Sequence, residues 1–396
     1  MKADRAVALL SFAAFASSAS LRGSDALLPL FASEFGTTAG GAAAVITAFS
    51  VAYGLLQVVH GPLGDRYGRY RMVFVITSLS MIATVACALA PTFGALVAAR
   101  FSAGALVGAI IPLSIAWIGD VIPYEKRQAV LARFLIGQML GIAIGTSAGG
   151  YLGEHFGWRS VFWTLACVYA LVSFFLWLEL RANPLTRRDS AAAPSSMAEG
   201  FGRMVALVRR PWVRTILLTG FMEGAFFYGA MAFVAFHAHN VLKLGIAASG
   251  TVLTAFAAGG LLYAAFSRRL VPRLGERGLA RAGGVILGIA FLGLVVAPSP
   301  FWLMTCMLGA GAGLYMLHNT LQVHATQMAP DSRGAAVALF ALFLFSGQSA
   351  GVWIGSKIVD AAGTVPLFLV AAAGLPMVAM DFRRRLARRM PLDQPG

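Results

Sequence analysis

Twelve apolar runs of about 20 residues, joined by short polar connections, dominate the sequence. A helix needs about 20 apolar residues to cross the ~30 Å hydrocarbon core of a bilayer, whereas a membrane β-barrel would show alternating segments of about ten residues. The chain is 59% hydrophobic and only 12% charged, against about 25% charged residues in soluble domains. We therefore predict an all-α membrane protein with spans at 7–31, 42–60, 72–91, 94–117, 129–152, 160–180, 212–236, 246–266, 279–297, 300–323, 335–356 and 364–381.

The positively charged residues lie almost entirely on one side of these spans. Of the 31 Lys and Arg residues, 26 fall in the even-numbered connections and the two termini, three fall on the opposite side, and Arg22 and Arg100 lie inside spans. Because connections rich in Lys and Arg stay in the cytoplasm, we predict that both termini are cytoplasmic. The asymmetry accounts for the net charge of +15 without a nucleic-acid partner. We expect a multi-pass protein of a bacterial inner membrane that functions as a monomer in the lipid bilayer.

The chain repeats itself after 206 or 207 residues. A parallel repeat of six helices is the architecture of a two-lobed transporter, which handles its substrate between the lobes near the middle of the membrane. The first run resembles a signal peptide, but its removal would leave an odd number of spans, so we expect an uncleaved helix. The matching features are Arg66-x-Gly68 with Arg273-x-Gly275, Arg127 after Pro123 with Arg333 after Pro330, Gly145-x3-Gly149 with Gly351-x3-Gly355, Gly157 with Gly363, and Phe162 with Phe368.

The repeat and the polar stretch in the middle of the chain suggest the domain limits. We predict a first six-helix bundle at 1–180, a cytoplasmic linker at 181–211, a second six-helix bundle at 212–381 and a basic cytoplasmic tail at 382–396. Weak helical patterning near 197–208 indicates a surface helix within the linker.

Four ionisable residues inside the spans are the first candidates for function, because charge is costly at membrane depth. Arg22 and Asp25 are three residues apart, so they share a helix face. Arg100 lies early in the fourth span and Glu223 in the seventh. A carboxylic acid in low-dielectric surroundings holds its proton more tightly than in water, so these acids could couple proton movement to transport. Structural ion pairs, and for Arg100 a cation that holds backbone carbonyls, are the alternatives.

Uncharged polar side chains form a second set of candidates, for a substrate cavity. A polar stripe on a membrane helix either lines a wet cavity or hydrogen-bonds a neighbouring helix. The predicted cavity residues are Tyr53, Gln57, Gln138, Tyr228, His318, Asn319, Gln322 and Gln348.

Glycines recur at every fourth position of the fifth span, from Gly137 to Gly149, and again in the eleventh, from Gly347 to Gly355. Small residues at this spacing allow helix backbones to approach closely, so we interpret both stripes as packing faces, with a sliding hinge as the alternative. Neither phosphate-binding loops nor metal-ligand spacings are found in the sequence, so we expect no enzyme activity, no cofactor and no metal.

The connection after the second span is a glycine-rich turn with four charged residues. This turn resembles the signature loop of the major facilitator superfamily of transporters, and three further stretches resemble the same family. Ser24 to Pro29 also resembles the first-span motif of its twelve-span drug/proton antiporters. The four stretches are Gly61-Pro62-Leu63-Gly64-Asp65-Arg66-Tyr67-Gly68-Arg69-Tyr70-Arg71, Arg100-Phe101-Ser102-Ala103-Gly104 continuing to Asp120 and Arg127, Gly141-x3-Gly145-Thr146-x2-Gly149-Gly150, and Gly157-Trp158-Arg159-Ser160-Val161-Phe162.

The resemblance implies a proton-coupled exporter of a small organic solute that works by alternating access. The family's antiporters carry a proline where Thr146 stands, which predicts a straighter fifth helix here. Alternatives are a proton symporter that takes up a sugar, an organic acid or another metabolite, and a non-transporting receptor or scaffold on the same fold. The residues implied in proton coupling are Asp25, Glu223, Arg100 and Arg22, and those implied in a cytoplasmic latch are Gly61, Gly64, Asp65, Arg66, Gly68, Arg69 and Asp120.

Overall fold

The computed structural model describes residues 2–187, 197–329 and 333–389, and the regular secondary structure of these residues is entirely helical. By length and hydropathy, eleven helical segments within these ranges can cross a membrane. The longest, α14 (Ile246–Val295), has 50 residues and breaks at Gly275, so it supplies two crossings. The predicted number of twelve spans is confirmed on this count.

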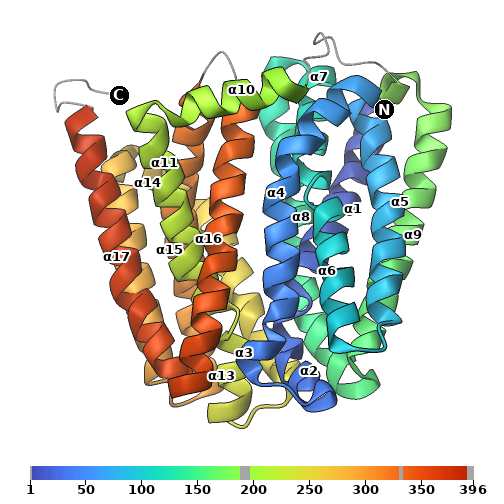
Figure 1. Cartoon of the computed structure of the whole chain (residues 1–396). Helices are drawn as coiled ribbons and strands as arrows, with labels where there is room; N and C mark the ends of the chain where they lie inside the picture. Colours follow the sequence, from blue (N-terminus) through green and yellow to red (C-terminus); the bar gives the residue numbers. More distant parts are fainter. Residues whose placement is uncertain (1, 188–196, 330–332, 390–396) are drawn as a thin grey trace.

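Helices from the first half of the chain form one bundle, coloured blue to green in Figure 1. The second, third, fifth and sixth spans each consist mainly of one long helix, whereas the first and fourth are built from shorter pieces. The elements are α1 (Lys2–Arg22), η1 (Asp25–Leu27), α2 (Leu28–Phe35), α3 (Ala39–Ala42), α4 (Ala44–Tyr67), α5 (Arg69–Ala88), α6 (Phe93–Val107), α7 (Ile110–Val121), α8 (Tyr124–Phe156), α9 (Trp158–Ala182) and η2 (Pro184–Arg187).

Helices from the second half form the other bundle, coloured green to red. Here the seventh span is the broken one. The elements after the helix α10 (Met197–Val208) are α11 (Pro211–Glu223), the π-helical turn η3 (Gly224–Tyr228), α12 (Gly229–Met231), α13 (Val234–Val241), α14, α15 (Pro300–Gln327), α16 (Arg333–Ala362) and α17 (Thr364–Arg389).

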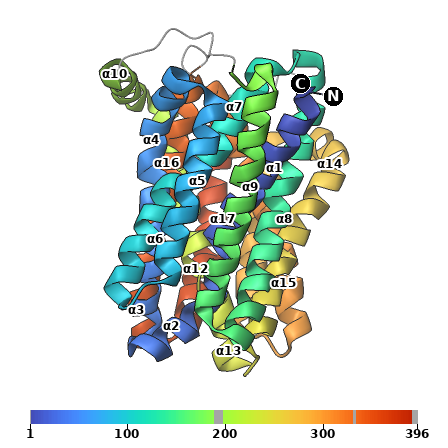
Figure 2. The same cartoon turned by 90° about the vertical axis from the view of Figure 1, so that its right-hand side faces the viewer.

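The start of α1 and the end of α17 lie at one end of the molecule, and α3 and α13 lie at the other (Figures 1 and 2). The helix α10 lies across the first of these ends and contacts both α4 and α16. It has the limits predicted for the surface helix of the linker. We call the two ends of the molecule the α10 end and the α3 end.

Single glycines reverse the chain at matching places in the two bundles. Gly68 and Gly275 have φ of 86° and 61°, and Gly157 and Gly363 have φ of 78° and 77°. Glycine adopts these left-handed values without the steric cost that other residues meet. The pairs are the ones predicted from the repeat. The prediction of a turn over the whole stretch from Gly61 to Arg71 is wrong, because α4 continues to Tyr67 and α5 begins at Arg69, so Gly68 alone is non-helical.

The glycine stripes are packing faces, as the sequence predicts. A Cβ atom on Gly141 would lie 2.3 Å from the carbonyl oxygen of Phe15 on α1. A Cβ atom on Gly351 would lie 2.1 Å from the carbonyl oxygen of Ala225 in η3. The fifth and eleventh spans therefore touch the first and seventh backbone to backbone, and α8 is uninterrupted through Thr146, as expected without the proline.

Candidate functional site

The first span is interrupted beside its acid. The helix α1 ends at Arg22, and Asp25 begins the short turn η1 that leads into α2. Arg22 Nη1 lies 3.3 Å from Asp25 Oδ2, and the two side chains are 3% and 0% exposed. The predicted pair is present, but it spans a break in the helix instead of lying along one continuous face. The guanidinium of Arg22 also reaches the second bundle, where its Cζ atom lies 4.4 Å from the ring centre of Tyr228.

The seventh span is also interrupted at its acid. The helix α11 ends at Glu223, and the π-helical turn η3 follows directly and ends at Tyr228. Such turns are rare and often occur at functional sites. Glu223 is fully buried, and its Oε2 atom lies 2.9 Å from Nδ1 of His318 on α15. The structure thus joins an acid predicted for proton coupling to a histidine predicted for the substrate cavity.

Each of these two acids has one oxygen without a hydrogen-bond partner among the described residues. The atoms are Asp25 Oδ1 and Glu223 Oε1, and both are buried. A buried polar atom that lacks a partner is unfavourable and usually has a functional reason. Each oxygen is therefore a favourable place for a proton or for a hydrogen-bond donor of a bound solute.

Arg100 connects the fourth span to the first. Its Nη1 atom donates a hydrogen bond of 3.2 Å to the carbonyl oxygen of Ser20, and its Cζ atom lies 4.0 Å from the ring centre of Phe49. The side chain is 1% exposed. These contacts fit a buried cation that holds a backbone carbonyl, and the part of Arg100 in proton transfer stays a prediction.

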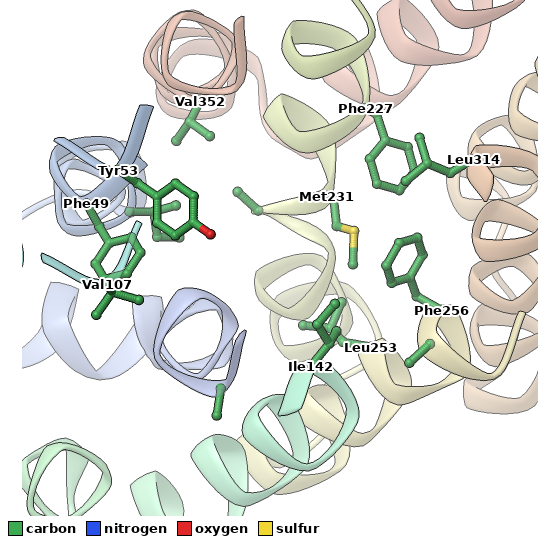
Figure 3. Close-up of a cluster of buried hydrophobic side chains, with 14 of the residues drawn as sticks. Phe49, Tyr53, Val107, Ile142, Phe227, Met231, Leu253, Phe256, Leu314 and Val352 are labelled. Atoms are coloured by element: carbon green, nitrogen blue, oxygen red, sulfur yellow. The ribbon is translucent and has the colours of Figure 1, made fainter. Parts of the chain in front are cut away.

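Two of the predicted cavity residues join the bundles at the contact between α4 and α16. Gln348 Nε2 donates a 2.6 Å hydrogen bond to Ser50 Oγ, and the ring of Tyr53 lies 4.2 Å from that of Phe345. Figure 3 shows Tyr53 among buried apolar side chains that come from both bundles. Of the remaining predicted cavity residues, Gln57 is buried, Gln138 and Asn319 are half-buried and Gln322 is exposed.

Further hydrogen bonds join the bundles toward the α3 end. Glu154 Oε2, near the end of α8, accepts a 2.5 Å hydrogen bond from the backbone N–H of Ala247 at the start of α14. Asp360, near the end of α16, accepts 2.8 Å hydrogen bonds from the backbone N–H of Gly40 and from the hydroxyl of Thr38 at the start of α3. These contacts hold the two bundles together at the α3 end.

Comparison with known proteins gives a family for this arrangement. The model of the Major Facilitator Superfamily matches residues 10–352. The chain belongs to the Major Facilitator Superfamily. It is 26% identical over 379 residues to the chloramphenicol resistance protein of Streptomyces lividans, covering 93% of each chain. It is 24% identical over 349 residues to the uncharacterized transporter YwfA of Bacillus subtilis strain 168, covering 88% of this chain and 84% of that one.

The solved structures agree on the fold. The nucleoside transporter NupG superposes with a TM-score of 0.78 at 15% identity, covering 97% of this chain and 99% of that one. The protein is thus a transporter of the superfamily, with twelve spans in two pseudo-symmetric bundles of six.

The residues that the superfamily resemblance assigns to a latch lie toward the α10 end. Arg69 Nη1 contacts Asp120 Oδ2 at 2.7 Å and donates a 3.2 Å hydrogen bond to the carbonyl oxygen of Ala116. Both contacts join α5 to α7 within the first bundle. Gly64 is buried against Leu113, and Arg66 is exposed. The structure does not describe the surroundings of Gly61 or the side chain of Asp65, so the latch stays a prediction.

Sequence reasoning missed Glu154 and Asp360. Acids at the ends of spans are common, so neither residue stands out by type or by local pattern. The signal that could have found them is the repeat itself, because the two acids are 206 residues apart, the same offset that relates the glycines. Their hydrogen-bond partners, Ala247 and Gly40, are 207 residues apart.

Proposed function

We propose that the protein is a proton-coupled secondary transporter that exports a small organic solute across a bacterial inner membrane by alternating access. The observation that carries this proposal is the pair of buried acids, Asp25 and Glu223, one in each bundle and each beside a break in its span. Interrupted helices with ionisable groups are typical of coupling sites in two-lobed transporters.

The contacts of Asp25 suggest how a proton would act on the bundles. Arg22 neutralises the charged form of Asp25 while it also lies over the ring of Tyr228 in the other bundle. Protonation of Asp25 removes the negative charge that attracts Arg22. The contact of Arg22 with Asp25 then weakens relative to its contact with the ring of Tyr228. A ligand or proton shifts a conformational equilibrium only through such a difference between states.

Export and orientation rest on two further observations. The distribution of Lys and Arg favours cytoplasmic termini, which supports a cytoplasmic location for the α10 end. The relative from Streptomyces lividans is a chloramphenicol resistance protein, which favours efflux over uptake.

Transport by purified protein in proteoliposomes tests the proposal. The probe is the solute that gives the largest thermal shift in a panel of drugs and metabolites that includes chloramphenicol. We expect an imposed pH gradient to drive the probe against the proton flow, and we expect Asp25→Asn and Glu223→Gln each to reduce that flux at least tenfold.

Glu276→Gln is the matched control, because Glu276 also contacts a histidine at 2.9 Å, His324, but its side chain is 38% exposed. This variant should keep its gradient-driven flux. If Asp25→Asn and Glu223→Gln both keep theirs, the acids do not couple protons. If a proton gradient directed into the vesicles fills them with the probe, the protein is an uptake symporter.

A further inference from the structure

A groove of about 430 Å³ lies between the first half of α14 and α15 in the second bundle. Its walls are apolar and come from both helices. The side chains are Leu262, Tyr263, Phe266, Leu270, Ala312 and Met316. Tyr263 and Met316 are nearly buried, at 5% and 7% exposed, and form the floor, whereas Leu262 and Phe266 are 43% and 46% exposed and form the rim.

Two arginines complete the lining. Arg269 and Arg273 are one helical turn apart, follow the apolar rim residues toward the α10 end, and are both exposed. Neither forms an ion pair with any side chain that the structure describes. The groove therefore has an apolar body and a doubly cationic mouth. Two arginines side by side are well suited to a phosphate group, because each guanidinium presents a planar set of N–H donors.

We propose that this groove binds one anionic phospholipid, with an acyl chain along the apolar walls and the phosphate between Arg269 and Arg273. Basic pockets between membrane helices at the cytoplasmic side attract anionic headgroups. The choice of the cytoplasmic leaflet rests on the orientation given under the proposed function, whereas the binding itself does not.

The matching place in the first bundle is packed differently, so the groove does not arise from the duplication of the helices alone. Around Arg66 and Arg273 the two halves of the chain are offset by 207 residues, so Gly64 matches Val271, the residue after Leu270 of the groove. A Cβ atom on Gly64 would lie 2.4 Å from Leu113 Cδ2, so α4 and α7 pack closely there. Arg269 matches Pro62 at the same offset. The close packing leaves no equivalent space at Gly64, and the second arginine is specific to the second bundle.

Native mass spectrometry of the purified protein, titrated with phosphatidylglycerol or phosphatidylcholine, tests the proposal. We expect one tightly retained phosphatidylglycerol. The double variant Arg269→Gln/Arg273→Gln should bind it roughly 30-fold more weakly, since about 1 kcal/mol per basic side chain near an anionic surface corresponds to about 2 kcal/mol for the pair. The control Arg268→Gln/Arg281→Gln removes the same charge from α14 at positions outside the groove and should bind as the unaltered protein does.

A second variant keeps the charge and fills the space. Ala312→Leu places a larger side chain in the apolar body and should also release the lipid, while a thermal melt reports that the protein is folded. Equal retention of phosphatidylglycerol by the double variant and its control would overturn the proposal. So would equal binding of phosphatidylcholine, or displacement of the lipid by glycerol phosphate alone, which would show an anion site without a lipid.

Discussion

Glu154 and Asp360 make the same contact in opposite directions between the two bundles. Each acid lies near the end of a long helix and accepts a hydrogen bond from a backbone N–H at the start of a helix in the other bundle. The bond from Ala247 to Glu154 is 2.5 Å long, and the bond from Gly40 to Asp360 is 2.8 Å long. A carboxylate at a helix N-terminus also interacts favourably with the helix dipole. The duplication of the chain has therefore placed two equivalent hydrogen-bonded contacts between the bundles at the α3 end.

Removal of the contacts made by Glu154 and Asp360 should allow the two bundles to separate at the α3 end. Hydrogen bonds to charged groups contribute about 1.5–3 kcal/mol each, so Glu154→Gln/Asp360→Asn should shift the balance between the two states of the transporter by tenfold or more. Distances between spin labels at Ser33 and Lys357 would report the change. Glu34→Gln is the control, because Glu34 lies at the same end but pairs with Arg159 inside the first bundle. An unchanged distance distribution in the double variant would show that other contacts close this end.

The hydrogen bond between Gln348 and Ser50 should couple the bundles energetically. A double-mutant cycle with Gln348→Leu and Ser50→Ala is expected to give a coupling free energy of about 0.5–1.5 kcal/mol in thermal or denaturant unfolding. Ser78→Ala with Gln348→Leu serves as a non-interacting pair, because Ser78 bonds with Ser173 within the first bundle. A coupling free energy of zero for Gln348 and Ser50 would contradict this contact.

Gly351→Ala should destabilise the second bundle by about 1–3 kcal/mol. The new methyl group would lie 2.1 Å from the carbonyl oxygen of Ala225, so a backbone must move, and such overpacking outweighs the gain in helix propensity. Gly119→Ala on α7 is the matched substitution, because no atom lies within 4 Å of its Cβ position. It should leave the melting temperature unchanged or raise it slightly. Equal melting temperatures for the two variants would argue against close contact of η3 with α16.

His318→Gln should change the pH profile of transport while His324→Gln does not. Glutamine can keep the hydrogen bond to Glu223 but cannot gain a proton, so one titrating group is removed from the pair. His324 makes the equivalent 2.9 Å contact with the half-exposed Glu276 at the α10 end. The measurement is gradient-free exchange of the probe solute from pH 5 to 9. Identical profiles for both variants would exclude His318 from the coupling site.

The spans and the repeat could be predicted because they depend on quantities the sequence contains directly. Apolar runs of sufficient length must be helical in a bilayer, where every backbone group needs an internal partner. The match between Gly157 and Gly363 follows from the offset of 206 residues that relates the two halves of the sequence. In the structure both glycines have a left-handed φ, which glycine adopts without steric cost.

The site could be predicted only in its parts. Composition indicates that Asp25 and Glu223 are costly at membrane depth, but the contact of Glu223 with His318 joins residues 95 positions apart and depends on how α11 packs on α15. The break after Arg22 was also missed, because apolar periodicity continues across it. Local patterns show which residues are exceptional and do not show which of them meet.

The π-helical turn after Glu223 gives the seventh span one residue more than a regular α-helix would need at this point. A turn of this kind arises when one residue is inserted into an α-helix, and each residue of an α-helix turns the chain by about 100°. The wider turn of η3 takes up the additional residue locally, because five residues bonded i to i+5 rotate the chain by about as much as four residues of an α-helix. The extra amino acid therefore widens the seventh span beside Glu223 without turning Tyr228 away from Arg22.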